Sequence, residues 1–170
     1  MSVSLTALAV MIVVMLGELA LSRRNERILI ARGAVQPPDP VYRTMRWAYP
    51  GAFVAMALEG ALIGPAAGAV ALAGVLIILA AKLLKGWAIA TLGVRWTYRV
   101  LVIPGAPLVS SGPYRWMRHP NYVGVIGELL GMAVLMAARV TGPVSLLFFS
   151  WLLRRRILAE ERALGFGGIY

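Results

Sequence analysis

Long apolar stretches restrict this 170-residue chain to a membrane-embedded fold. A helix crosses the ~30 Å hydrocarbon core of a bilayer with about 20 apolar residues. Four stretches come close to that length, at residues 3–21, 47–63, 66–84 and 122–138. A fifth, from residue 142 to about residue 157, is free of charge only between residues 143 and 153. It crosses fully only if the arginines after it reach back to the lipid headgroups.

The sequence therefore predicts an all-α fold, a polytopic integral-membrane helical bundle of about five transmembrane helices. The composition agrees, with 60% hydrophobic and 14% charged residues, where an ordinary soluble domain carries about 25% charged residues. The chain has no cysteine, which excludes disulfides, thiolate zinc sites and cysteine nucleophiles. It has one histidine, so a metal site built on several imidazoles is excluded and no metal is expected.

The basic residues orient the predicted bundle. The net charge is +10, from 17 Lys and Arg against 7 acidic residues. In a five-span model every basic residue except Arg139 falls on one side, including Lys82 and Lys85 at the cytoplasmic end of the third span. Because basic residues favour the cytoplasmic side, the N-terminus is expected outside and the C-terminus in the cytoplasm. This topology accounts for the charge, so no nucleic-acid partner is expected.

Glycine and proline mark the expected connections. Gly64-Pro65 predicts the turn between the second and third spans, and Thr141-Gly142-Pro143 the turn between the fourth and fifth. The proline cluster at residues 36–40 predicts a helix-free cytoplasmic loop. Glycines recur every four residues at Gly60, Gly64 and Gly68 and at Gly127 and Gly131, a spacing typical of close helix packing.

A first polar cluster, residues 111–122, lies directly before the fourth span. Pro120 suits the first position of a helix, which makes His119 the capping residue. The free N–H groups of that helix, with Arg118 beside them, predict a site for a carboxylate or phosphate. The alternative is that these arginine and aromatic residues only anchor a span at the interface.

A second polar cluster follows the fifth span. If the helix continues, Arg156 and Glu160 share a face at i, i+4 and can pair. Glu160 and Glu161 point about 100° apart on a helix, so one can face inward while the other is solvated. The alternative is a solvated charged tail.

Three acids fall inside predicted spans and are candidates for function, since charge is costly in hydrocarbon. Glu18 is expected to pair with Arg23 and Arg24 at the membrane edge. Glu59, near the outer end of its span, is expected to be hydrated. Glu128 lies about two turns beyond His119 and is the strongest candidate of the three.

Together the two clusters resemble the isoprenylcysteine carboxyl methyltransferase family and its phospholipid methyltransferase relatives. The resemblance covers residues 109–170. We expect a single domain of residues 1–170, in which residues 1–108 form the scaffold spans. The matching residues are Gly112-Pro113-Tyr114, Arg118-His119-Pro120-x-Tyr122-x-Gly124, Glu160-Glu161-x-x-Leu164 and Phe166-Gly167-x-x-Tyr170.

The resemblance implies an integral-membrane enzyme that binds S-adenosylmethionine between the last two spans and the cytoplasmic tail. Its cofactor pocket maps onto residues of both clusters, and the position next to the methyl acceptor onto Arg156 and Glu161. A phenol or enol acceptor needs a base, for which His119 or Glu128 is the candidate. The cofactor-pocket residues implied are Tyr114, Arg118, His119, Pro120, Tyr122 and Glu160.

The implied function is O-methylation of a lipophilic acceptor that enters from the bilayer. The acceptor is an isoprenylcysteine-type carboxylate or, as in a bacterial branch that the chain resembles, an alkylpyrone or alkylresorcinol hydroxyl. The implied location is a bacterial cytoplasmic membrane. Two alternatives stay open, a phospholipid N-methyltransferase and a non-enzymatic membrane transporter or scaffold, although a transporter would place its polar groups near the midplane.

Overall fold

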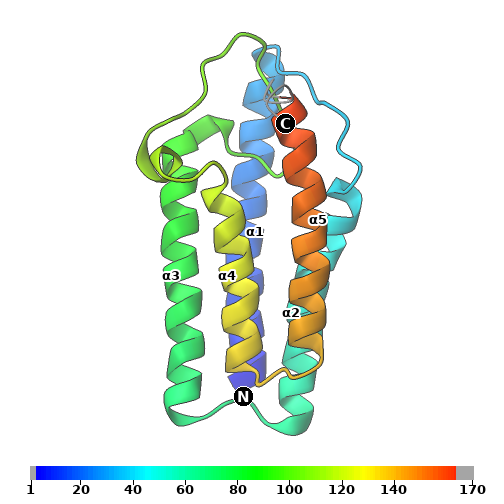
Figure 1. Cartoon of the computed structure of the whole chain (residues 1–170), viewed down its shortest axis with the longest axis vertical. Coiled ribbons are helices and arrows are strands. Elements are labelled where there is room, and N and C mark those ends of the chain that lie inside the picture. The colour runs from blue at the N-terminus through cyan, green and yellow to red at the C-terminus, as the bar shows by residue number, and fades with distance from the viewer. Residues whose placement is uncertain (1–2, 164–170) are drawn as a thin grey trace.

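The computed structural model describes residues 3–163 and is all-helical over that range, apart from one isolated bridge between Val35 and Val102 (Figure 1). This confirms the predicted all-α class. The long helices are α1 (Val3–Ala31), α2 (Tyr42–Ile63), α3 (Gly68–Leu92), α4 (Pro120–Leu135) and α5 (Thr141–Ala163), with the short 3-10 helices η1 (Gly93–Arg95) and η2 (Gly112–Arg115).

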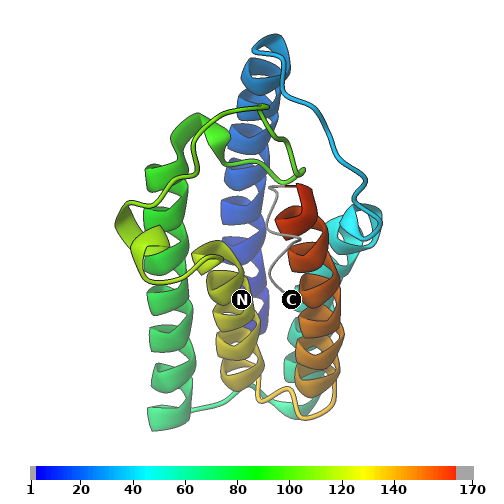
Figure 2. The ribbon, with the colours of Figure 1, turned by 45° about the horizontal axis from the view of Figure 1, so that its top comes forward.

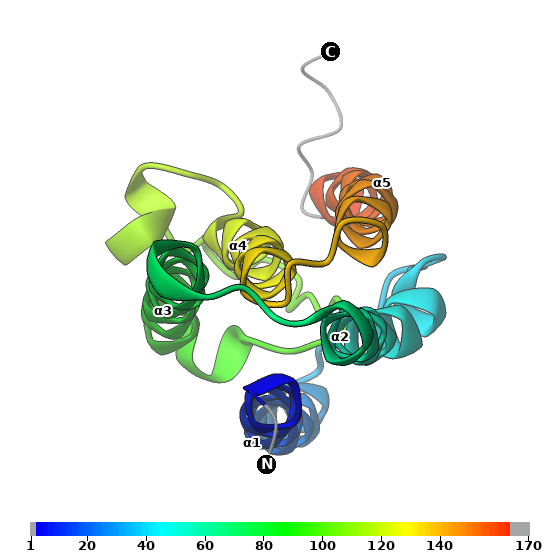
Figure 3. The same cartoon turned by 90° about the horizontal axis from the view of Figure 1, so that it is seen from below.

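The five long helices stand side by side, with α4 between α3 and α5 and with α1 on the opposite side of the bundle (Figure 3). An apolar core fills the space between them, centred on Phe53, Leu129, Met132 and Phe149. Short connections, residues 64–67 and 136–140, join the helices at one end. The long connections, residues 32–41 and 96–119, lie at the other end, and the second of them includes most of the first polar cluster (Figure 2).

Helix length and hydropathy identify α1 and the segment Gly68–Arg95 as able to cross a membrane. Helix α4 is apolar but has 16 residues. Several predicted boundaries were wrong, because hydropathy marks where apolar residues end and not where the helix ends. Helix α1 runs ten residues past residue 21, and its last turns are rich in arginine, a good helix former. Likewise α3 continues to Leu92, so Lys82 and Lys85 lie inside a helix and not in a cytoplasmic connection.

Glycine permits the close approach of α3 and α4. A Cβ at Gly127 would lie 2.8 Å from the Ala81 Cβ, and one at Gly131 2.6 Å from the Ile78 Cγ1. The predicted packing role of these two glycines is therefore confirmed. Gly64 and Gly68 act differently, since they have φ of +89° and +57° and open space around them. They allow the turn between α2 and α3.

Two expectations at the end of the bundle with the short connections were wrong. Thr141 begins α5, so the turn precedes it, and Pro143 sits in the first helical turn, where proline is tolerated. Glu59 is not simply hydrated. Its carboxylate accepts hydrogen bonds from the Val140 N–H at 3.0 Å and the Thr141 N–H at 2.7 Å, which caps the start of α5. The expected helix-free connection at residues 36–40 is confirmed.

Candidate functional site

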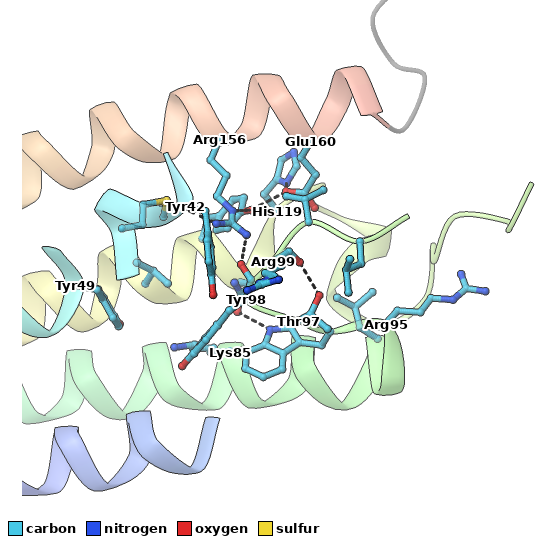
Figure 4. Close-up of a pocket in the computed structure, with 18 of the residues that line it drawn as sticks. Tyr42, Tyr49, Lys85, Arg95, Thr97, Tyr98, Arg99, His119, Arg156 and Glu160 are labelled. Carbon is cyan, nitrogen blue, oxygen red and sulfur yellow. Dashed lines mark hydrogen bonds and ion pairs between the residues drawn. The ribbon is translucent and has the colours of Figure 1, made fainter. Parts of the chain in front are cut away.

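A cavity of about 650 Å³ lies at the end of the bundle that carries the long connections (Figure 4). Such a volume is typical of small-molecule sites. The polar side chains of both predicted clusters line one part of it, among them His119, Tyr122, Arg156 and Glu160. Side chains of α1 and α2 line an apolar part, including Met15, Leu16, Met45 and Pro50.

The start of α4 places the first cluster at the cavity. Pro120 is the first helical residue and His119 the N-cap, as predicted. The His119 side chain does not cap the helix. Its ring stacks on the Tyr122 ring instead, with centroids 5.4 Å apart and an interplanar angle of 15°. The positive end of the helix is therefore left without a side-chain cap from His119, at the polar part of the cavity.

The two predicted clusters meet, although about 40 residues separate them in the sequence. The Tyr122 hydroxyl donates a hydrogen bond to the Glu160 Oε2 at 2.7 Å. The His119 Nε2 lies 3.3 Å from the Glu161 Oε1, and the His119 Nδ1 lies 3.9 Å from the Glu160 Oε2. Arg118, 59% exposed at the rim, pairs with Glu161 at 3.6 Å. The structure thus brings these residues together, and their roles stay predictions.

Tyr114 also lines the cavity, from the 3-10 helix η2. Burial raises the pKa of the Tyr114 hydroxyl well above its usual value, and the nearby Glu160 carboxylate raises it further. The hydroxyl therefore stays protonated near neutral pH and can donate a hydrogen bond.

Arg156 is buried and links α5 to three other segments of the chain. Its Nε donates to the Tyr122 hydroxyl at 2.9 Å, and its Nη2 donates to the Tyr98 carbonyl. Its Nη1 lies 3.3 Å from the Asp39 Oδ2. The sequence predicted that Arg156 pairs directly with Glu160. This was wrong: among the described residues the Tyr122 hydroxyl lies between the two side chains and contacts both.

Asp39 is a site residue that the sequence analysis missed. It belongs to the connection that the proline cluster predicted, and its Oδ1 accepts hydrogen bonds from the Val41 N–H at 3.3 Å and the Tyr42 N–H at 3.0 Å. A carboxylate just before a helix that begins at Tyr42 is a typical capping signal and could have been noticed. Asp39 therefore holds both the start of α2 and the Arg156 guanidinium.

A polar stripe on α1 holds one wall of the cavity and was also missed. The Ser22 Oγ accepts a hydrogen bond from the Tyr98 N–H at 2.8 Å. The Asn25 Nδ2 donates to the carbonyls of Gly93 at 3.2 Å and Trp96 at 2.8 Å. Glu18, Ser22 and Asn25 stand at i, i+4 and i+7, a helical spacing that marks one face of the span.

A buried cluster of four charges lies behind this wall. Lys85 lies 2.6 Å from Glu18 and 3.3 Å from Glu128, while Lys82 lies 2.9 Å from Glu128 and 3.2 Å from Glu18. The expected pairing of Glu18 with Arg23 and Arg24 was therefore wrong. Glu128 is fully buried, and its Oε2 accepts a hydrogen bond from the Tyr49 hydroxyl at 2.5 Å. Lys85 and Tyr49 separate it from the cavity that they line.

Gly124 of the first motif has a packing function. A Cβ at this position would lie 3.0 Å from the Lys85 Cβ and 3.2 Å from the Ala81 carbonyl oxygen. The glycine therefore lets the Lys85 side chain pass close against α4. The remaining motif residues, Leu164, Phe166, Gly167 and Tyr170, lie outside the described residues.

Comparison with known proteins places these features in a family. The model of the isoprenylcysteine carboxyl methyltransferase family matches residues 72–165, which run from α3 to beyond the end of α5. The chain is 34% identical to the uncharacterized protein YpbQ of Bacillus subtilis over 157 residues, 92% of this chain and 94% of that protein. It is 28% identical to an uncharacterized protein of Haemophilus influenzae over 86% of each chain. No solved structure matches. The chain therefore belongs to the isoprenylcysteine carboxyl methyltransferase family of membrane methyltransferases.

Proposed function

We propose that this protein is an S-adenosylmethionine-dependent O-methyltransferase that acts on a lipophilic acceptor. One observation carries the proposal: a single cavity joins the polar clusters of α4 and α5 to an apolar wall of α1 and α2. A methyl transfer enzyme needs such a cavity, because the reaction depends mainly on holding a polar cofactor and an acceptor in line.

The residues present fit the cofactor. The start of α4, which His119 does not cap, and the neighbouring Arg118 suit its carboxylate. Glu160 and the Tyr122 ring suit its positive charges. Pro120 fixes the start of the helix, and Tyr114 supplies a protonated hydroxyl at the same end. When bound, S-adenosylmethionine supplies a methyl group that leaves a positively charged sulfur, with the electron pair of the broken bond staying on sulfur.

The apolar wall fits the tail of the acceptor. It includes Leu16 of α1 and Trp47 of α2, which are 58% and 72% exposed on the outer surface of the bundle. An exposed tryptophan next to a basic residue, here Arg46, is typical of the membrane interface. The tail can therefore lie between these helices while the polar head reaches the start of α4.

His119 is the proposed base for a hydroxyl acceptor. When its Nε2–H donates to Glu161, the Nδ1 lone pair is free to take the acceptor proton as the new O–C bond forms. Arg156 orients Tyr98 and Tyr122 around the acceptor. Glu128 can act on the acceptor through the Tyr49 hydroxyl that lines the cavity. A carboxylate acceptor has no proton to lose and needs no base.

The first test is cofactor binding. S-Adenosylhomocysteine should stabilise the detergent-purified protein against heat. At a ligand concentration of 100 times Kd, the free energy of unfolding should rise by about 2.7 kcal/mol. His119→Ala and Glu160→Gln should each weaken binding at least ~10-fold, because each removes a polar group of the pocket. Leu158 is exposed on the same helix as Glu160, so Leu158→Ala is the matched control and should leave binding unchanged. If saturating ligand gives no shift in the parent protein, the proposed function fails.

The proposed site faces the cytoplasm, with all five helices crossing the membrane. Cysteine labelling tests this topology cleanly, since the chain has no native cysteine. A cysteine at Ser110, beside the cavity, should react only from the cytoplasmic side. A cysteine at Val140, exposed at the opposite end of the bundle, should react only from the outside. Reaction of both from one side would contradict the topology.

A further inference from the structure

Two tyrosines in the inner part of the cavity donate their hydroxyl protons to carboxylates that lie behind the cavity wall. The Tyr98 hydroxyl lies 3.0 Å from the Glu18 Oε2, and the Tyr49 hydroxyl lies 2.5 Å from the Glu128 Oε2. Both carboxylates also pair with Lys82 and Lys85, and a carboxylate held in an ion pair accepts hydrogen bonds and donates none. Each tyrosine therefore donates its O–H to the buried cluster. The lone pairs of the two phenol oxygens remain for other partners.

Tyr98 is held rigidly in this arrangement. Its N–H donates to Ser22, its carbonyl accepts from Arg156, and its hydroxyl donates to Glu18. Burial raises the pKa of the Tyr98 hydroxyl, and the Glu18 carboxylate raises it further, so the hydroxyl does not ionise near neutral pH. Figure 4 shows the Tyr98 side chain running from the level of Arg156 down towards Lys85. A group fixed at three points keeps its geometry without a cost when a ligand binds.

The ammonium groups of the two lysines in the cluster are held by its two carboxylates. The Lys85 side chain is 2% exposed, and its Nζ is directed at Glu18 and Glu128. Lys82 has the same two partners. The Nζ of Lys85, which also lines the cavity, is therefore engaged by two carboxylates, while the phenol oxygens of Tyr49 and Tyr98 are left as hydrogen-bond acceptors.

We propose that Tyr98, held by Glu18, selects methyl acceptors that carry a hydroxyl group over acceptors whose only polar group is a carboxylate. This proposal rests on the proposed function and names the substrate class of the same site. Before methyl transfer an acceptor hydroxyl donates a hydrogen bond to the Tyr98 oxygen, and the same O–H turns to the His119 Nδ1 when the proton leaves. A carboxylate at the same place would meet the lone pairs of the Tyr98 oxygen with no proton to offer. Tyr98 is thus a positioning residue for the acceptor.

The experiment measures acceptor binding without cofactor, by calorimetry on the detergent-purified full chain at pH 7. The probes are an alkylphenol and an alkylbenzoate with the same tail, because the phenol keeps its proton at this pH and the benzoate does not. The parent protein should bind the phenol more tightly. Tyr98→Phe should weaken phenol binding by ~3- to 10-fold, the effect of one hydrogen bond, and leave benzoate binding unchanged. Tyr42→Phe, a cavity tyrosine whose ring contacts Arg156, should keep the parent ratio.

Several results would overturn the proposal. Benzoate binding as tightly as phenol to the parent, or an equal loss for both probes in Tyr98→Phe, would show that Tyr98 does not select. Tighter binding of an alkylamine with the same tail would assign the acceptor to amines. Glu18→Gln gives a second measurement, because its amide can donate to the Tyr98 oxygen and should move the ratio towards benzoate. An unchanged ratio there also contradicts the proposal. The binding of S-adenosylhomocysteine, measured separately, shows whether the proposed function itself has failed.

Discussion

Replacing Lys85 by methionine is expected to lower the free energy of unfolding by about 3–5 kcal/mol, as breaking a buried ion pair typically does. Lys85 is almost completely buried and pairs with both Glu18 and Glu128. Methionine fills a similar volume but leaves Glu18 and Glu128 with Lys82 alone, so one buried negative charge is no longer balanced. Denaturant unfolding in detergent micelles, followed by circular dichroism, measures the loss.

A double variant separates charge from packing. Lys85→Met with Glu128→Gln removes one charge of each sign, so it should recover a large part of the lost stability. Arg155→Met on the exposed face of α5 is the control and should change stability little. A loss below about 1 kcal/mol for Lys85→Met would mean that the cluster does not hold the helices together as a charged unit.

Replacing Arg156 by lysine is expected to lower kcat/KM by about 10²-fold, a loss typical of small misplacements in an active site. Lysine keeps the charge but not the planar set of donors that reaches Tyr122, Tyr98 and Asp39 together. Labelled methyl transfer to an alkylphenol measures the rate, and S-adenosylhomocysteine binding is measured separately.

The neighbouring Arg155 provides the matched control, because it is exposed and its guanidinium lies over the Trp151 ring. Arg155→Lys should keep the parent rate. If Arg156→Lys also keeps it, the contacts of the guanidinium do not organise the site.

The polar end of the site could be predicted from the sequence because its signals are local. Proline at position 120 fixes a helix start, which places His119 and Tyr122 at one end of a span. Glu160 and Glu161 follow the next apolar stretch and return to the same end in an antiparallel pair of helices. The family resemblance rested on these same residues, and the matching family model agrees.

The rest of the site could not be predicted because it depends on contacts between distant segments. Asp39 reaches Arg156 across more than 100 residues, and Glu18 reaches Lys85 across 67. Hydropathy ended the third span at residue 84, between Lys82 and Lys85, because these two charges lower the hydropathy of this stretch. Inside the bundle, charges of opposite sign neutralise one another, so the helix continues through them.

The order of the cluster's charges along the chain has a consequence for how the protein enters the membrane during synthesis. Glu18 emerges first, Lys82 and Lys85 follow in α3, and Glu128 comes last, so the running charge of the cluster is −1, then +1, then zero. A single charge at the centre of an inserting helix costs roughly 2.5–3.5 kcal/mol at the translocon. We therefore expect α1 and α3 to lower this cost by leaving the translocon together, with the charge of the cluster balanced only when α4 brings Glu128.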